Sequence, residues 1–276
     1  MKIYKLSIIM LFVLSITTSC NDWEKKEKLA DIKLKKIESL IHQNALNSAK
    51  IEIDSLHLLF PKLISKRKVA AALEDTILRI ESSRTLAYCD SLLPKKQLEL
   101  NVILKNFRLE KNAKYQEIGN YIYKTQITES IPKKTYLKTY VDEKADLFLI
   151  SNYCGPKIDH SCVEASNGDI TSRTDTLLAN NSANYSFTDG ENHWETLTFK
   201  NDAANPLASF ITQESDKQIK VNLCGKKRYT YFLSNSDKKA ITETYRLWIV
   251  KKDIHQLEKE IKKAKNRIAR INNNKK

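Results

Sequence analysis

The last part of the chain carries apolar residues at alternating steps of three and four positions. They are Leu247, Val250, Ile254, Leu257, Ile261, Ala264, Ile268 and Ile271. No Gly or Pro interrupts residues 236–276, and Ser236 is suited to be an N-cap. The pattern predicts one long helix over 236–276, whose heptad seam must be buried against partner helices.

The N-terminal part offers such partners. Apolar residues at helical spacing predict helices over 24–42, 51–60 and from 62 to about 105, and Pro94 interrupts the third. Because proline lacks an N–H group and clashes with the preceding turn, we expect a kink or a fresh short helix there. Packing of these helices on 236–276 predicts a monomeric antiparallel bundle, with a homodimeric coiled coil as the alternative.

Between the helical parts the apolar residues alternate on a step of two. The pattern predicts strands in 107–112, 114–127, 134–143, 146–154, 161–166, 169–174, 193–199, 217–225 and 229–234. Asn167-Gly168 favours a tight turn, and Asn205 followed by Pro206 favours a short helix over 206–213. The sequence thus predicts an α+β fold, in which a mainly antiparallel β domain, residues 106–235, lies between helical residues 20–105 and 236–276.

The first residues are typical of an export signal. Two lysines precede residues 6–16, which are apolar apart from two serines and are too few to remain as a membrane-spanning helix. Three small residues then lead to Cys20. This resembles a bacterial lipoprotein signal, which implies that residues 1–19 are removed and that Cys20 is acylated. An ordinary signal peptide with a buried or paired cysteine is the alternative. The lipoprotein interpretation predicts anchoring in the cell envelope, with the outer membrane favoured and the protein either periplasmic or exposed at the surface.

Positive charge gathers near the end of the chain. The sequence has 47 Lys or Arg and 33 Asp or Glu, a net charge of +14. Five of the basic residues are Lys262, Lys263, Lys265, Arg267 and Arg270. Basic blocks bind nucleic acid or anionic lipid, and export makes the membrane the nearer partner. We therefore expect this tail to support membrane attachment and expect no nucleic-acid partner, with a solvated helix face as the alternative.

Four cysteines follow Cys20, namely Cys89, Cys154, Cys162 and Cys224. Export permits disulfides, and four cysteines allow three pairings. Cys154 and Cys162 flank a turn-rich segment and are the favoured pair. The chain has no CxxC motif, so neither a zinc cluster nor a thioredoxin-type redox motif is indicated.

Motifs for catalysis are missing from the sequence. It contains no HExxH, GxSxG, P-loop or GxGxxG, and we therefore expect neither an enzyme nor a cofactor. Two weak alternatives are kept. An extended strand would place Asp189, Glu191, His193 and Glu195 on one face as cation ligands. In the second, Asp159 would orient His160 beside a nucleophilic Cys162.

Two further patterns suggest surface chemistry. Tyrosines recur in the β part, at Tyr115, Tyr121, Tyr123, Tyr136, Tyr140, Tyr153, Tyr185, Tyr229 and Tyr231. Such residues either fill a sheet core or form an aromatic binding face. Ser55, Thr76, Ser91 and Thr176 each lie between Asp and an aliphatic residue. That triplet resembles the acceptor of Bacteroidota O-glycosylation, and its alternative is a helix whose aliphatic residue belongs to the core.

The layout as a whole also resembles a known group. A lipoprotein signal, a helical hairpin, a β domain containing YLKTYVDEKADLFLISNYCG and a basic C-terminal helix are similar to uncharacterised lipoproteins from Bacteroidota. That resemblance implies no reaction. We expect a lipid-anchored envelope protein whose helical stalk carries a non-catalytic module for a protein or glycan. An enzyme with an unrecognised site in the β domain is the alternative.

Overall fold

The computed structural model describes residues 23–112, 114–126, 134–168 and 170–273. Its contacts divide the chain into two compact units. The helical unit comprises residues up to Asp90 together with residues from Lys259, and the β unit comprises Ser91–Glu258. The boundaries between these two units lie inside the two long helices of the chain. The fold class is α+β, as the sequence predicted.

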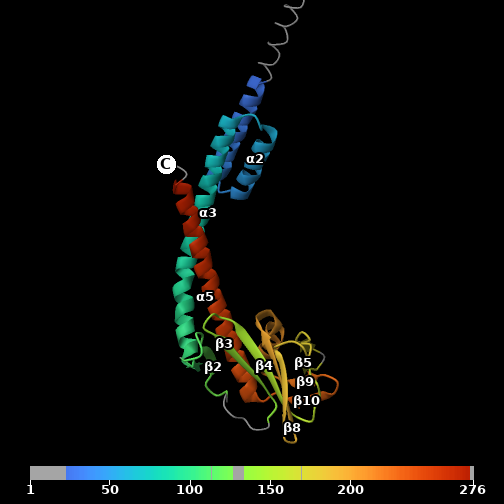
Figure 1. Cartoon of the computed structure of the whole chain (residues 1–276). Coiled ribbons are helices and arrows are strands. Elements are labelled where there is room, and N and C mark those ends of the chain that lie inside the picture. Colours follow the sequence, from blue (N-terminus) through green and yellow to red (C-terminus); the bar gives the residue numbers. More distant parts are fainter. Residues whose placement is uncertain (1–22, 113, 127–133, 169, 274–276) are drawn as a thin grey trace, which may run out of the picture. The chain divides into compact units, whose positions relative to one another are not determined.

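Three helices build most of the helical unit (Figure 1). The first is helical from residue 23 to 42, and it is followed by α2 (Leu46–Leu59) and the start of α3 (Ile64–Leu104). Asn44, in the first turn, has φ +62°, a conformation that Asn tolerates better than most residues. The buried side chains form one core, made of Ala30, Leu34, Ile37, Leu46, Ala49, Ile53, Leu56, Phe60, Leu63, Ala70 and Ile77.

Helix α3 continues through Pro94, so of the two expected outcomes, a kink or a fresh short helix, the fresh helix is excluded. Proline at this position supplies no N–H for the carbonyl of Asp90, so one hydrogen bond of the ladder is missing. Leu93 and Leu100 pack against the core of the β unit on either side of the proline. That apolar burial holds the turn helical despite the lost bond.

Helix α5 (Asn235–Asn273) confirms the predicted C-terminal helix. The seam residues Leu247, Val250, Ile254, Leu257, Ala264 and Ile271 are all buried. α5 packs antiparallel on α3, and Lys96 pairs with Asp253 at 2.8 Å while Glu99 pairs with Arg246 at 3.5 Å. The N-cap is Ser234 rather than Ser236, since the Ser234 hydroxyl accepts the backbone N–H of Asp237 and donates to its carboxylate.

The β unit holds two antiparallel sheets. The larger has the order β1-β2-β3-β4-β8-β7 and the smaller β10-β9-β5-β6. The strands are β1 (Phe107–Glu110), β2 (Asn120–Tyr123), β3 (Tyr136–Asp142), β4 (Leu147–Gly155), β5 (Cys162–Asn167), β6 (Ile170–Arg173), β7 (Asn184–Asp189), β8 (Asn192–Lys200), β9 (Lys220–Cys224) and β10 (Arg228–Phe232).

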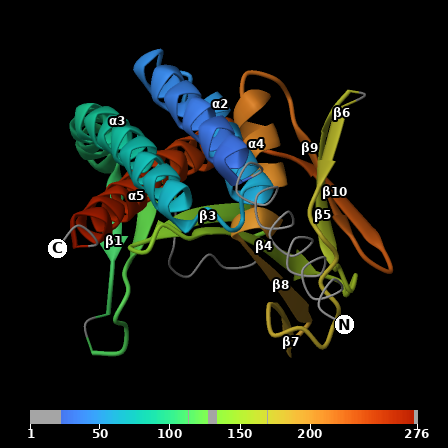
Figure 2. The same cartoon turned by 90° about the horizontal axis from the view of Figure 1, so that it is seen from above.

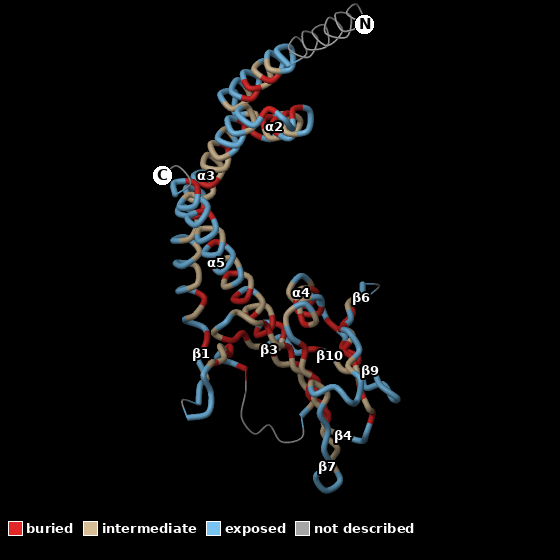
Figure 3. Tube along the Cα trace, turned by 45° about the horizontal axis from the view of Figure 1, so that its top comes forward, coloured by how far each residue is buried: buried red, intermediate tan, exposed pale blue. Residues whose placement is uncertain are grey.

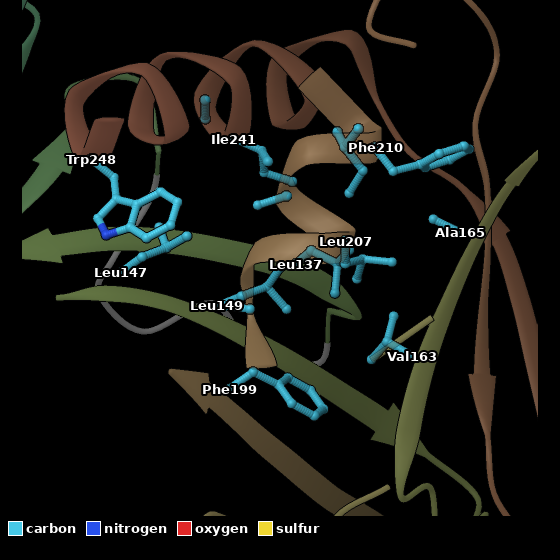
Figure 4. Packing of buried hydrophobic residues seen from close by; sticks show 14 of the residues in the cluster. Leu137, Leu147, Leu149, Val163, Ala165, Phe199, Leu207, Phe210, Ile241 and Trp248 are labelled. Carbon is cyan, nitrogen blue, oxygen red and sulfur yellow. The ribbon is translucent and has the colours of Figure 1, made fainter. Parts of the chain in front are cut away.

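Helices complete the core of this unit. A short 3₁₀ helix, η1 (Asn201–Ala203), leads into α4 (Asn205–Gln213), which packs against β5 and β6 (Figure 2). Figure 4 shows side chains of both sheets, α4 and α5 pointing into one core, including Leu149, Val163, Leu207 and Trp248. None of the described helices combines the length and apolar character needed to cross a bilayer.

One strand prediction was wrong in detail, and one strand was not predicted. The segment 114–119 contains turns rather than the start of a strand, and Tyr115 is 76% exposed there. Strand β7, which the sequence reading missed, is the edge of the larger sheet and is exposed on nearly every residue (Figure 3). An edge strand that buries little shows no apolar alternation, so the periodic signal is absent.

Candidate functional site

The connection between β4 and β5, residues 156–161, passes from one sheet of the β unit to the other. Glu195 on β8 holds it in place. Its Oε1 accepts the backbone N–H groups of Ile158 and Asp159, each at 2.8 Å, and its Oε2 accepts that of His160 at 2.7 Å. Asp159 has φ +51°, which helps to turn consecutive N–H groups toward one anion.

The ring of His160 completes the same site. Its Nδ1 lies 2.7 Å from Oε2 of Glu195, and both side chains are buried. Burial alone would raise the pKa of Glu195, but the hydrogen bonds from the His160 ring and the three N–H groups outweigh it and lower that pKa to about 2. Glu195 is therefore an ionised acceptor at neutral pH, and His160 Nδ1 donates to it.

On its other side His160 meets a serine. The Oγ of Ser151, on β4, lies 3.3 Å from His160 Nε2. Serine, histidine and carboxylate thus stand in the order of a hydrolase triad. Ser151 has no exposed surface, since it lies among the core-facing residues of the central strand β4. A nucleophile must reach its substrate, so in this conformation the three residues form a structural network.

The loop 156–161 is also bound to the β9–β10 turn. Lys227 donates its N–H to the carbonyl of Ile158 at 3.1 Å, and Ser161 donates to that of Cys224 at 2.8 Å. Gly225 makes this close approach possible, because a Cβ there would lie 2.3 Å from the carbonyl oxygen of Asp159. The loop is therefore held by β8 on one side and by the β9–β10 turn on the other.

A cavity of about 690 Å³ opens beside this loop. Lys157, Arg173 and Lys226 bring positive charge to it. Asp159 offsets part of that charge, lying 3.3 Å from Lys157 Nζ and 3.0 Å from Lys226 Nζ. The hydrogen bond to Lys226 is the main reason why the pKa of Asp159 is lowered. The formal net charge of the residues that line the cavity is therefore positive.

The rest of the cavity wall is mixed. Ser161, Thr176, Asn184 and Ser186 provide polar side chains. Leu177, Leu178 and Ala179 provide an apolar stretch, and His160, Glu195 and Cys224 also line the cavity. A site with this lining suits a small hydrophilic ligand that has both hydroxyl groups and negative charge.

The candidate cation ligands are not brought together. Asp189 and Asn192 are paired in the hairpin register, so the chain reverses at Gly190 and Glu191 instead of remaining extended. His193 and Glu195 do share a face, with 3.7 Å between His193 Nε2 and Glu195 Oε1, but Glu195 is occupied by the loop. Within the described ranges, no group of three His, Cys, Asp or Glu residues is placed to hold a metal ion.

The thiol hypothesis is corrected as well. Asp159 does not orient His160, because Glu195 does so. Cys162 Sγ accepts hydrogen bonds from Arg173 Nε at 3.2 Å and Nη2 at 2.9 Å, and the His160 ring is hydrogen-bonded to Glu195 and Ser151. The sequence placed Asp159, His160 and Cys162 close together, but the ring of His160 is oriented by Glu195, which is distant in the sequence.

The predicted Cys154–Cys162 bridge is absent, and none of the four described cysteines is joined to another by a disulfide. Cys154 pairs with Trp194 in the larger sheet, whereas Cys162 belongs to the smaller sheet and lies opposite Cys224. Cys89 is buried in α3. The two cysteines that the sequence placed close together were separated because the intervening segment crosses between sheets.

The tyrosines divide between core and surface. Tyr123 and Tyr153 are buried, Tyr121 and Tyr231 pack against the core, and Tyr136 and Tyr140 are half-buried. Tyr185 is 61% exposed and Tyr229 is 38% exposed. Tyr185 lies beside Phe187, whose ring stacks on Trp194, on the side of the β7–β8 hairpin away from Asn184 and Ser186. Most of these tyrosines fill the sheet core or its margin.

The remaining predicted sites have simple positions. Ser55 lies in α2, Thr76 and Ser91 lie in α3, and Thr176 is exposed in the β6–β7 connection beside the cavity. Cys20 lies outside the described residues. The five basic residues of the tail are exposed on α5, whose C-terminal end lies beside α3 (Figure 1).

At the start of the helical unit a second cavity, of about 380 Å³, is lined by Trp23, Lys26 and residues 59–63. Several large apolar residues are exposed there: Trp23 is 46% exposed, Leu58 80%, Leu59 58% and Ile64 64%. Lys26 and Lys62 flank it. We call this surface the Trp23 end.

Comparison of the chain with known protein families, with curated proteins and with solved structures found no match.

Proposed function

We propose that this protein is a lipid-anchored protein of the bacterial cell envelope whose β unit binds an acidic glycan without chemically altering it. The observation that carries the glycan assignment is the cavity beside residues 156–161, with three cations, four polar side chains and an apolar stretch in its wall. A volume near 690 Å³ accommodates a short oligosaccharide rather than a folded protein. Carboxylates on the sugar would be attracted by Lys157, Arg173 and Lys226.

The Trp23 end supports the membrane half of the proposal. Trp and Lys are the residues that favour the boundary between headgroups and acyl chains, because each combines an apolar body with a polar tip. Trp23 stands three positions after the expected acylated residue, Cys20. A lipid on Cys20 would bring the exposed Trp23 and Leu59 to the depth at which such side chains are stable.

The binding half is tested by isothermal titration of the unlipidated chain with uronic-acid and sialic-acid oligosaccharides and their neutral counterparts. We expect the acidic members alone to bind. Lys226→Gln should weaken binding by about 3- to 10-fold, since an exposed charge contributes up to roughly 1 kcal/mol. Lys217→Gln is the matched control, because Lys217 is also exposed and paired with one carboxylate, that of Glu214. Failure of every acidic sugar to bind, or an equal effect of both variants, would overturn the assignment.

The anchor is tested separately in cells by labelling with an alkyne fatty acid. We expect the wild-type protein to carry the label and Cys20→Ala to lose it. A label that persists in Cys20→Ala, or that is absent from both, would overturn the anchor and leave the glycan assignment untouched.

The triad-like order of Ser151, His160 and Glu195 favours a second candidate, a hydrolase. It requires a rearrangement that exposes Ser151, which the structure does not contain. We therefore place it second, and the Discussion gives its test.

A further inference from the structure

Cys162 and Cys224 face each other across the smaller sheet. Residues 162–166 of β5 run antiparallel to β9, and Cys162 is directly opposite Cys224 in this register. Directly opposed residues of antiparallel strands have Cα atoms about 4.5–5.5 Å apart, and disulfides span about 4.4–6.8 Å between Cα atoms. The sheet itself thus holds the two residues at a separation that a disulfide spans.

The two thiols also point toward the same side of the sheet. Directly opposite residues of antiparallel strands project from the same face of the sheet, and Cys162 Sγ lies 3.9 Å from the backbone carbonyl oxygen of Cys224. Cys162 shares this face with Glu164, whose opposite residue on β6 is Arg173. The two cysteine side chains therefore project from one face of the smaller sheet, beside Arg173.

The surroundings give the two sulfurs different roles. Cys224 is half-buried and lines the cavity of about 690 Å³, so a small reagent can reach it. Cys162 has no exposed surface and lies under the guanidinium of Arg173, at 2.9 Å from Nη2. Positive charge at that distance offsets the negative charge that a sulfur acquires when it attacks a disulfide.

We propose that Cys162 and Cys224 are a redox pair that a low-molecular-weight disulfide oxidises to a cross-strand disulfide. In the first step the Cys224 thiolate attacks the reagent, forming a mixed disulfide and releasing one thiol. In the second, Cys162 attacks the Cys224 sulfur and releases the second thiol. The two thiol protons pass through solvent to the released thiolates. Two electrons leave the protein, and one disulfide is exchanged for another.

The proposal does not depend on the glycan assignment, because it uses the cavity only as an entrance. It replaces the Cys154–Cys162 pairing that the sequence favoured. The closed loop is long, about 60 residues, so the oxidised protein should also be harder to unfold. We expect its Tm to be higher than that of the reduced protein by roughly 5–10 °C.

The test uses the full chain with Cys20→Ser, treated with oxidised glutathione while folded and then alkylated with iodoacetamide in denaturant, followed by mass spectrometry of the intact protein and of its peptides. We expect a single disulfide between the peptides containing Cys162 and Cys224, with Cys89 and Cys154 still not joined to them. A pairing to Cys89 or Cys154, or unchanged alkylation of both thiols in protein that unfolds cooperatively, would overturn the proposal.

Three variants separate the roles of the two cysteines and of Arg173. In Cys162→Ser the reaction should stop at one glutathione adduct on Cys224, whereas in Cys224→Ser the buried Cys162 should gain no adduct. Arg173→Met should slow the second step, so that the mixed disulfide accumulates several-fold relative to wild type. Thermal unfolding of each variant confirms that it is folded, and an adduct on Cys162 in folded Cys224→Ser would contradict the assigned order.

Discussion

His160 Nδ1 donates to Glu195 Oε2 at 2.7 Å, and through this pair β8 of the larger sheet holds the loop that leads into β5 of the smaller one. The same carboxylate accepts three consecutive backbone N–H groups. A buried charge with four donors is compensated, but its replacement by a neutral group leaves those donors without an adequate acceptor.

The first prediction follows from this pair. Glu195→Gln should lower the free energy of unfolding by roughly 3 kcal/mol, because the amide has one acceptor oxygen and turns an NH₂ group toward N–H donors. Denaturant unfolding measures the change. Glu191→Gln, in the exposed hairpin turn, is the control and should stay within about 0.5 kcal/mol of wild type. Equal stability of Glu195→Gln and wild type would show that the carboxylate is not the connection between the sheets.

The same residue gives a pH dependence. The pKa of Glu195 is lowered from 4.5 to about 2 in the folded protein, so its contribution is fully present above pH 4.5 and is lost as the pH falls toward 2. The shift corresponds to a contribution on the order of 3 kcal/mol. The stability difference between wild type and Glu195→Gln should be constant from pH 7 to 5 and shrink below pH 4.5. A difference that stays constant down to pH 2 would refute this.

Ser151 tests the hydrolase alternative. Because Ser151 is completely buried, a fluorophosphonate probe should not label the folded protein, and Ser151→Ala should leave glycan binding unchanged. Intact mass after exposure to the probe is the measurement. Labelling of wild type that disappears in Ser151→Ala would favour the hydrolase instead of the binding protein.

Gly225 should be intolerant of any side chain. The Cβ of Gly225→Ala would lie 2.3 Å from the carbonyl oxygen of Asp159 and 2.5 Å from that of Ile158, and backbone atoms cannot rotate away. We expect a loss of roughly 2–3 kcal/mol in chemical unfolding. Gly190→Ala is the comparison: it has open space but φ +62°, so it should cost only about 1 kcal/mol. A larger loss of stability in Gly190→Ala than in Gly225→Ala would mean that the loop 156–161 can move to accommodate a side chain.

Replacing Pro94 and Pro206 by alanine should change the stability of the protein in opposite directions. Pro94→Ala restores an N–H inside α3 and should stabilise the protein by about 1–2 kcal/mol. Pro206→Ala removes a proline from the first turn of α4, where its fixed φ is favourable, and should destabilise by about 0.5–1 kcal/mol. Thermal unfolding compares the two variants. A lower Tm for Pro94→Ala would indicate that the proline itself stabilises α3 at this position.

The Trp23 end predicts a fluorescence change at membranes. In a full-length variant with Cys20→Ser, Trp194→Phe and Trp248→Phe, Trp23 is the single emitter. Its emission should shift to the blue with vesicles that contain anionic lipid, and salt should reduce the shift because Lys26 and Lys62 contribute to attachment. Adding Leu59→Ser should weaken the shift. If the emission wavelength is the same with and without vesicles, the Trp23 end does not contact the membrane.

The sequence alone determined the elements that bury a regular stripe. The heptad from Leu247 to Ile271 and the alternation in β3, β4 and β8 follow the repeats of a helix and of a strand. These elements could be predicted because an apolar residue recurs at each repeat of the buried face. The α+β class followed from their order. Elements without a buried stripe, such as β7, gave no such signal.

The tertiary structure decided everything that depends on contact between distant segments. Glu195 reaches residues 158–160, Cys162 meets Cys224 instead of Cys154, and α3 continues through Pro94. Each is set by which strands become neighbours and which faces share a core. Sequence spacing constrains only contacts between residues that are close along the chain. Where two sheets or two helices pack together, the burial of their side chains outweighs the local secondary-structure preference.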